Sequence, residues 1–133
     1  MVSHGVVHFE IPGDDPAKLA TFYANLFGWQ IDKMPMGEGG DYWMFQTDPT
    51  DNKGMPTEPG AVNGGVFKKQ NPGHRPINYV NVESVDDYVA KAKGLGATVL
   101  MDNTPIPGMG SFAQLMDPEG NYFGIFQAAQ PAQ

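Results

Sequence analysis

Two residues near the start of the chain, His8 and Glu10, carry side chains suited to acid–base chemistry or to metal binding. They lie in the segment VVHFEI (6–11), whose alternation of apolar and polar residues is typical of a β-strand. Both side chains are therefore expected on the same face. A histidine exchanges protons near neutral pH, so His8 and Glu10 are the candidate catalytic residues. The alternative is a half-buried structural histidine that is hydrogen-bonded to Glu10 or to a backbone carbonyl.

A second group of residues could bind a planar organic ligand. If Gly124 in NYFGIF (121–126) faces a cavity, strand alternation places Tyr122 and Phe126 on the same face. In the segment DYWMFQTD (41–48), the inner side is formed by one of two alternating pairs, Trp43 with Phe45 or Tyr42 with Met44. Aromatic rings can stack on a ligand, although the same pattern also fits ordinary core residues. The candidate ligand-binding residues are Trp43, Phe45, Asn63, Tyr79, Tyr122, Gly124 and Phe126.

Short elements must position these residues, because glycine and proline are frequent throughout the chain. In the first half, Asp15 followed by proline predicts the start of a helix, and Gly28 predicts its end. Apolar residues at helical spacing predict one buried stripe, formed by Leu19, Phe22, Tyr23 and Leu26. Strands are expected at 6–11, 29–34, 41–48 and 61–69.

The same order of elements repeats after a linker at 70–76. Ser84 followed by an acidic residue at position 87 predicts a capped helix start, and Gly94 and Gly96 predict its end. The expected buried stripe of this helix is Val85, Tyr88, Val89 and Ala92. Strands are expected at 77–82, 97–102, 110–117 and 121–126. His4 and His74 fall in the terminus and the linker, where we expect them to be solvated.

The repeat predicts the fold class. It is an α+β fold of two tandem βαβββ modules, at about 5–69 and 77–128, within a single domain over 1–133. Neither module could bury its sheet alone. Pairing of modules, within one chain or between two, would give a curved, partly open mixed β-barrel with helices outside, whose cup could hold a ligand.

Composition excludes several classes of function. The net charge is -7, and only 8 of the 133 residues are lysine or arginine, so binding to nucleic acid or to an anionic membrane is not expected. The absence of cysteine excludes thiol nucleophiles, disulfides and thiolate metal sites. The N-terminal segment has neither a basic region nor a long apolar run, so we expect no signal peptide and a cytoplasmic location. No serine-nucleophile, phosphate-loop or dinucleotide motif is present.

The sequence resembles the vicinal oxygen chelate superfamily, which includes glyoxalase I, bleomycin-resistance proteins and extradiol dioxygenases. The resemblance rests on VVHFEIPGDDPAKLATFYANLFGW at the front, on MDPEGNYFGIFQ at the back, and on the repeat. It implies a homodimer, in which modules of one chain or of two chains form each cup. Fold membership does not specify the activity, because the superfamily includes isomerases, oxygenases, transferases and binding proteins.

Metal-using members of the superfamily place one ligand on each of four strands. Carried over to this chain, the resemblance gives His8 as the first ligand. The second would fall near Gly64 or Gly65, the third at Ile77 or Asn78, and the fourth at Gly124. One matching position cannot hold a divalent ion firmly, because that requires three or more converging donors. We therefore expect no cofactor, with a weakly held divalent ion at His8 and Glu10 as the alternative.

Small residues at or near these ligand positions have two explanations. Gly64, Gly65, Ser111 or Ala113, and Gly124 could relieve crowding in a curved sheet, or they could make room for a flat ligand. Three functions follow. The first is a metal-free small-molecule binding protein of the resistance type, with an aromatic or hydrophobic ligand. The second is a lyase, isomerase or dioxygenase that uses His8 and Glu10, and the third is an accessory subunit with a filled cup.

Overall fold

The computed structural model describes residues 4–35, 41–47, 61–69 and 73–129. Within these ranges the chain forms an α+β fold whose elements follow the order βαβββ twice. The elements are β1 Val6–Gly13, α1 Pro16–Phe27, β2 Gln30–Pro35, β3 Asp41–Gln46, β4 Asn63–Lys68, β5 Ile77–Asn81, α2 Val85–Gly94, β6 Thr98–Ile106, β7 Gly110–Met116 and β8 Tyr122–Ala128. The predicted fold class is confirmed. The segments 36–40 and 48–60, which separate the expected strands of the first half, lie outside the described residues.

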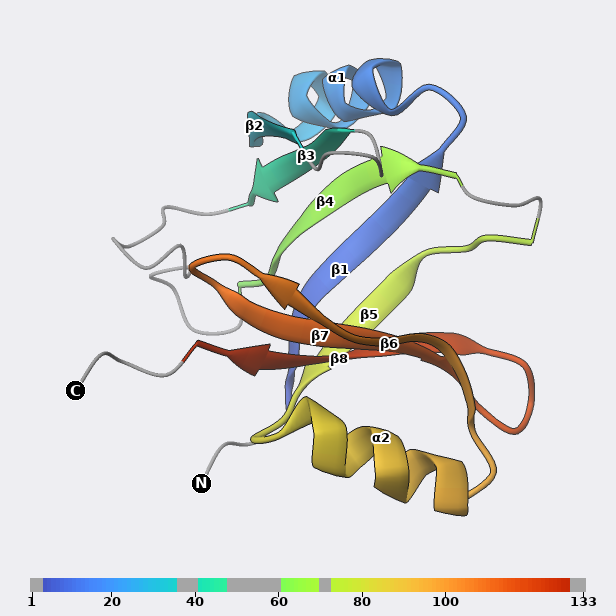
Figure 1. Ribbon diagram of the computed structural model, residues 1–133. Helices are drawn as coiled ribbons and strands as arrows, with labels where there is room; N and C mark the ends of the chain where they lie inside the picture. Colours follow the sequence, from blue (N-terminus) through green and yellow to red (C-terminus); the bar gives the residue numbers. More distant parts are fainter. Residues whose placement is uncertain (1–3, 36–40, 48–60, 70–72, 130–133) are drawn as a thin grey trace. The chain divides into compact units, whose positions relative to one another are not determined.

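The chain divides into two compact units. The first unit comprises residues 8–76, and the second comprises residues 77–133 together with the residues up to Val7. In the first unit the strand order is β2-β3-β4-β1 (Figure 1), in which β1 runs parallel to β4 and the other neighbours are antiparallel. In the second unit the order is β5-β8-β7-β6, with β5 parallel to β8. Each unit therefore places its last strand between its first and third strands.

Helix α1 begins and ends where the sequence predicts. The Asp15 side chain accepts a hydrogen bond from the Lys18 backbone N–H, and Gly28 closes the helix in the left-handed region, at φ 74°. The predicted buried stripe is partly wrong. Ala20 is the buried residue of the helix, whereas Phe22 and Leu26 are more than half exposed. The core instead receives the neighbouring line of side chains, so the helix is rotated relative to the stripe that we expected.

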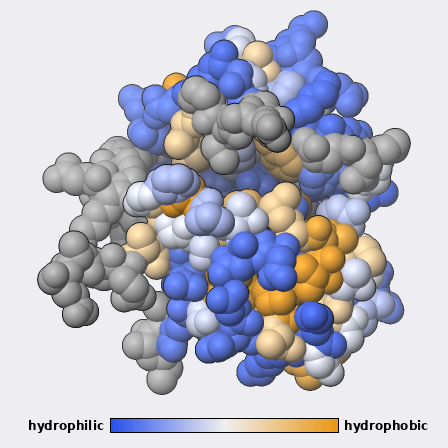
Figure 2. All heavy atoms as spheres, in the orientation of Figure 1, coloured by the Kyte–Doolittle hydropathy of each residue, from blue (hydrophilic) through white to orange (hydrophobic). Residues whose placement is uncertain are grey.

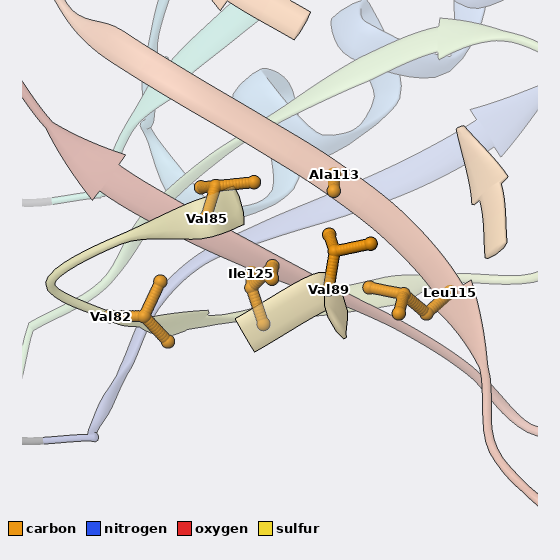
Figure 3. Packing of buried hydrophobic residues seen from close by; sticks show 6 residues of the cluster. All are labelled: Val82, Val85, Val89, Ala113, Leu115 and Ile125. Carbon is orange, nitrogen blue, oxygen red and sulfur yellow. The ribbon is translucent and has the colours of Figure 1, made fainter. Parts of the chain in front are cut away.

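Helix α2 follows its prediction closely. Ser84 caps it by accepting a hydrogen bond from the Asp87 backbone N–H. Val85 and Val89 are buried in the core of the second unit, and Tyr88 and Ala92 pack against that core. Figure 3 shows how side chains from this helix, from β7 and β8, and from the residue that follows β5 meet in one apolar cluster. The cluster consists of Val82, Val85, Val89, Ala113, Leu115 and Ile125.

The core of the first unit is rich in aromatic residues. Ala20, Phe45 and Val66 are its buried members, and they bring together α1, β3 and β4. Phe9, Ile11, Leu19, Tyr23, Trp29, Ile31 and Trp43 pack around them. Phe9 and Ile11 thus face α1, as alternation along β1 predicts, which leaves His8 and Glu10 on the opposite face of the strand.

The two remaining histidines differ in their exposure. His4 is exposed, as expected, and its ring nitrogens contact the Asn81 carbonyl and the Tyr88 hydroxyl. The expectation for His74 is wrong. It is 8% exposed and lies edge-on to Phe67, with 4.7 Å between the ring centroids. Burial, with a smaller effect of the Lys69 charge, lowers the pKa of His74.

The surface drawn in Figure 2 is mainly hydrophilic, with a group of hydrophobic residues in the region of the second unit. Exposed apolar side chains of that unit include Leu95, Leu100, Met101 and Met109. Among the described residues, no helix has the length and the apolar character that a membrane crossing requires.

Candidate functional site

His8 lies on β1 in a desolvated environment. Burial lowers the pKa of His8 to about 4, so the imidazole is neutral at physiological pH. Its Nε2 atom lies 2.7 Å from the Tyr42 hydroxyl, and the two rings are stacked with an interplanar angle of 22°. A neutral imidazole can accept the phenolic proton at Nε2 when its other nitrogen carries hydrogen. His8 is therefore part of a His–Tyr pair, a partnership that differs from the Glu10 contact considered from the sequence.

The Tyr42–His8 hydrogen bond crosses a strand. Tyr42 lies on β3 and His8 on β1, and β4 runs between them (Figure 1). The crossing takes place over Gly65, where an added Cβ atom would collide with the Tyr42 ring. Because a side chain at position 65 would block the path of the ring, glycine is what allows the tyrosine to reach the histidine.

The second unit contains a matching bridge. Tyr79 on β5 accepts a hydrogen bond of 2.8 Å from the Gln114 side-chain amide on β7. Between these strands runs β8, and Gly124 pairs with both Tyr79 and Gln114 in the strand register. A Cβ atom on Gly124 would collide with the Tyr79 ring.

The two bridges run in opposite directions. In the first unit the tyrosine comes from the third strand and its partner from the first; in the second unit the tyrosine comes from the first strand and its partner from the third. In both units the glycine lies on the last strand. Of the two explanations offered for glycine at these positions, relief of crowding fits the described residues, because a protein ring fills the space at Gly65 and at Gly124.

The residues predicted to bind a ligand fall on different faces. Trp43 and Phe45 belong to the core beneath α1, and Phe45 is fully buried. Strand alternation puts Tyr42 and Met44 on the His8 face instead. In the second unit, Tyr122, Gly124 and Phe126 lie on one face of β8, and Tyr79 on the adjacent strand β5 pairs with Gly124. Ligand binding by any of these residues stays a prediction.

Asn63 and Glu10 lie beside His8. Asn63 is directly opposite His8 in the parallel β1–β4 pair, and Glu10 is opposite Gly65. Asn63 is 6% exposed, and its Oδ1 atom accepts a 2.9 Å hydrogen bond from the Thr47 backbone N–H. The first unit therefore gathers three polar side chains around Gly65, those of His8, Tyr42 and Asn63, with Glu10 on the same face.

No local sequence pattern pointed directly to Tyr42 or Gln114 as members of bridges. Tyr42 entered only as one of two alternatives for the inner side of its strand, and Gln114 was not singled out. The useful signal lies in the glycines, since a glycine in the middle of a strand often marks a place where another group approaches closely. A tyrosine on an adjacent strand is then a candidate for that group.

The residues at the four expected metal positions do not fit a metal site. Among the described residues, no group of three or more histidine, aspartate or glutamate side chains comes together. At the second and fourth positions, tyrosine rings cover Gly65 and Gly124. At the third, Ile77 is fully buried and Asn78 is exposed. A neutral phenol is a weak donor compared with the carboxylates and imidazoles that hold divalent ions.

The family model described as a glyoxalase-like domain matches residues 8–126. The chain belongs to the glyoxalase-like domain family. The resemblance to the vicinal oxygen chelate superfamily is thereby confirmed, both by this match and by the solved structures that share the fold.

Curated relatives of this glyoxalase-like protein are longer than the chain itself. A Mycobacterium tuberculosis protein named as a glyoxylase, CFP32, is 28% identical over 122 residues, which are 90% of this chain and 42% of that protein. The anthracycline biosynthesis protein DnrV of Streptomyces peucetius is 24% identical over 135 residues, covering 90% of this chain and 45% of that protein. The chain therefore spans less than half the length of these relatives.

Solved structures share the fold of this glyoxalase-like protein at low sequence identity. A variant of methylmalonyl-CoA epimerase from Streptomyces coelicolor is 16% identical, with a TM-score of 0.71 and 99% of each chain covered. A hypothetical protein from Bacillus halodurans is 13% identical, with a TM-score of 0.69 and the same coverage. At this level of identity the likeness establishes the fold alone.

Proposed function

We propose that this glyoxalase-like protein is a metal-free binding protein for a small organic ligand of aromatic or hydrophobic character. The observation that carries the proposal is the Tyr42–His8 bridge over Gly65. It engages the Nε2 atom of the one histidine that matches a family ligand position. It also covers the strand position from which a second ligand would project. A site built in this way is poorly suited to bind a cation, and it offers a neutral, partly apolar surface to a ligand.

The chemistry of the surface suits an uncharged aromatic compound. The Tyr42 ring offers an aromatic face, with Met44 on the same side of β3, and the neutral imidazole of His8 adds no charge. Stacking on an aromatic ring contributes about 0.5–1.5 kcal/mol beyond the area that it buries. Two relatives, one named as a glyoxylase and one as an anthracycline biosynthesis protein, also have names that concern small organic molecules.

The experiment combines elemental analysis with ligand binding. Protein purified without chelator should contain no stoichiometric transition metal. A panel of aromatic compounds, read by thermal shift, should include compounds that stabilise the fold, and a ligand at 100 times its Kd adds about 2.7 kcal/mol. Truncation Tyr42→Ala should weaken binding about tenfold through the loss of one aromatic contact.

Two variants control for simpler explanations. Tyr42→Phe keeps the ring over Gly65 and removes only its hydroxyl, so most of the stacking should survive. Tyr88→Phe removes a tyrosine hydroxyl that lies 3.0 Å from His4 in the second unit, and it should leave binding unchanged. A stoichiometric metal that is lost in His8→Ala would refute the metal-free proposal and favour the enzyme that uses His8 and Glu10. A panel without any stabilising compound would favour the accessory subunit.

The assembly and the location follow from the same proposal. We propose a homodimer, because the curated relatives have room for a second copy of this domain within one chain. We propose a cytoplasmic location, because a chain without cysteine needs no oxidising compartment. The exposed Phe22 and Leu26 on α1 offer apolar surface for such a contact. Light scattering on the purified protein should give twice the chain mass of 14.4 kDa.

A further inference from the structure

Asn63 has a buried side-chain amide of which only one end is used. Its oxygen accepts hydrogen bonds from the Thr47 backbone N–H at 2.9 Å and from the Thr47 hydroxyl at 3.3 Å. Its Nδ2 atom donates no hydrogen bond to any described residue. Asn63 is 6% exposed, so bulk water does not readily replace the missing acceptor. Buried donors without an acceptor are rare in native proteins, and each one calls for an explanation.

The orientation of the amide follows from its neighbours. If the oxygen and nitrogen exchanged places, the Asn63 N–H groups would face the backbone N–H of Thr47, which is also a donor. The nitrogen must therefore point away from Thr47. Because Asn63 is paired with His8 across β1 and β4, its side chain rises from the same face of the sheet as the imidazole.

The surroundings restrict the acceptor that this nitrogen would take. His8 is neutral, and Glu10 lies two residues along on the same face of β1. Among the described residues of β1 to β4, the strand registers place no lysine or arginine on this face that would compensate an anion. A buried anion without such a partner is strongly disfavoured. A neutral carbonyl oxygen needs only a donor.

We propose that Nδ2 of Asn63 donates a hydrogen bond to a carbonyl oxygen of the ligand, so that the ligand is a neutral aromatic carbonyl compound. This inference rests on the proposed binding function and makes it more specific. Tyr42 supplies the aromatic surface, and Asn63 supplies the polar contact that sets the orientation of the ligand. Asn63 is thus the residue that determines specificity.

Matched pairs of compounds test the inference. Indanone and indane, and fluorenone and fluorene, differ only in whether a ring carbon carries a carbonyl oxygen. In an apolar site without a donor, the hydrocarbon of each pair binds more tightly, because the ketone loses its hydrogen bonds to water. With Asn63 as donor we expect the reverse order, a preference for the ketone of about tenfold, measured by isothermal titration calorimetry.

The variant Asn63→Asp removes the donor and keeps an acceptor for Thr47. It should abolish the preference for the ketone, whereas Asn78→Asp, which adds the same charge at an exposed position of β5, should retain it. If Asn63→Asp does not fold, the side-chain amide resonance of Asn63 in the ¹⁵N spectrum of the unmodified protein gives a second measurement. That resonance should shift on addition of the ketone and not on addition of the hydrocarbon.

The outcomes separate this inference from the proposed function. If the protein binds these compounds but prefers the hydrocarbon, or if Asn63→Asp keeps the preference for the ketone, the role of Asn63 is wrong and binding stands. If neither member of either pair binds, both the inference and the proposed aromatic ligand are overturned.

Discussion

Glycine at position 65 should be stabilising only because Tyr42 is present. In Gly65→Ala the new methyl group would collide with the Tyr42 ring, and over-packing of this kind costs about 1–3 kcal/mol. If the ring instead moves away, the Tyr42–His8 hydrogen bond of 2.7 Å is lost, and the loss of one such hydrogen bond costs about 0.5–1.5 kcal/mol. Whichever of these alternatives is the less costly, Gly65→Ala should lower the free energy of unfolding by roughly 1–3 kcal/mol.

The sign should reverse when the ring is absent. A Tyr42→Ala background removes the ring atoms that lie nearest to the Cβ position of residue 65, and alanine is better than glycine in a strand by roughly 0.5–1 kcal/mol. The double-mutant cycle should therefore show a coupling energy of at least about 1.5 kcal/mol between positions 42 and 65. Urea unfolding followed by tryptophan fluorescence reports on this unit directly, because Trp29 and Trp43 both pack in its core.

A matched control is available on α2. Gly94 has ordinary backbone angles and nothing within 4 Å of its Cβ position, so Gly94→Ala should be neutral or slightly stabilising. The proposed dependence on Tyr42 is wrong if Gly65→Ala lowers the free energy of unfolding equally with tyrosine and with alanine at position 42. Equal costs would mean that position 65 requires glycine for its backbone conformation. The placement of the Tyr42 ring would then not depend on that glycine.

Two further predictions follow from the same contacts. Gly124→Ala should destabilise the second unit for the reason given for Gly65, and Tyr79→Ala should relieve most of that cost, which urea unfolding of the single and double variants would reveal. Because the pKa of His8 is about 4 in the folded protein and 6.5 in the unfolded chain, the unfolded state binds more protons between these values, and stability should fall as the pH drops from 6.5 to 4. The loss is about 3 kcal/mol at most. It should be smaller in His8→Gln, which would keep the part due to His74, whose pKa is lowered in the same direction; an unchanged slope in His8→Gln would contradict the assignment.

Local patterns in the sequence determined the elements and their order. Asp15 and Ser84 predict both helix starts because a cap depends on a hydrogen bond to a backbone N–H three residues away. Alternation along β1 predicts that His8 and Glu10 share a face, because that periodicity is a property of the extended backbone. The predicted buried stripe on α2 is confirmed because periodicity is also a property of the helical backbone, and the apolar and polar faces of this helix differ clearly.

Tertiary structure decided the contacts that matter for the site. Helix α1 has large apolar residues on more than one side, so periodicity could not tell which line of side chains packs on the sheet. Tyr42 reaches His8 only because β3, β4 and β1 are neighbours in that order, and the unused end of the Asn63 amide is defined only once Thr47 has taken the other end. Such contacts join residues 16 and 34 positions apart, and they depend on strand order and register, which local sequence patterns do not encode.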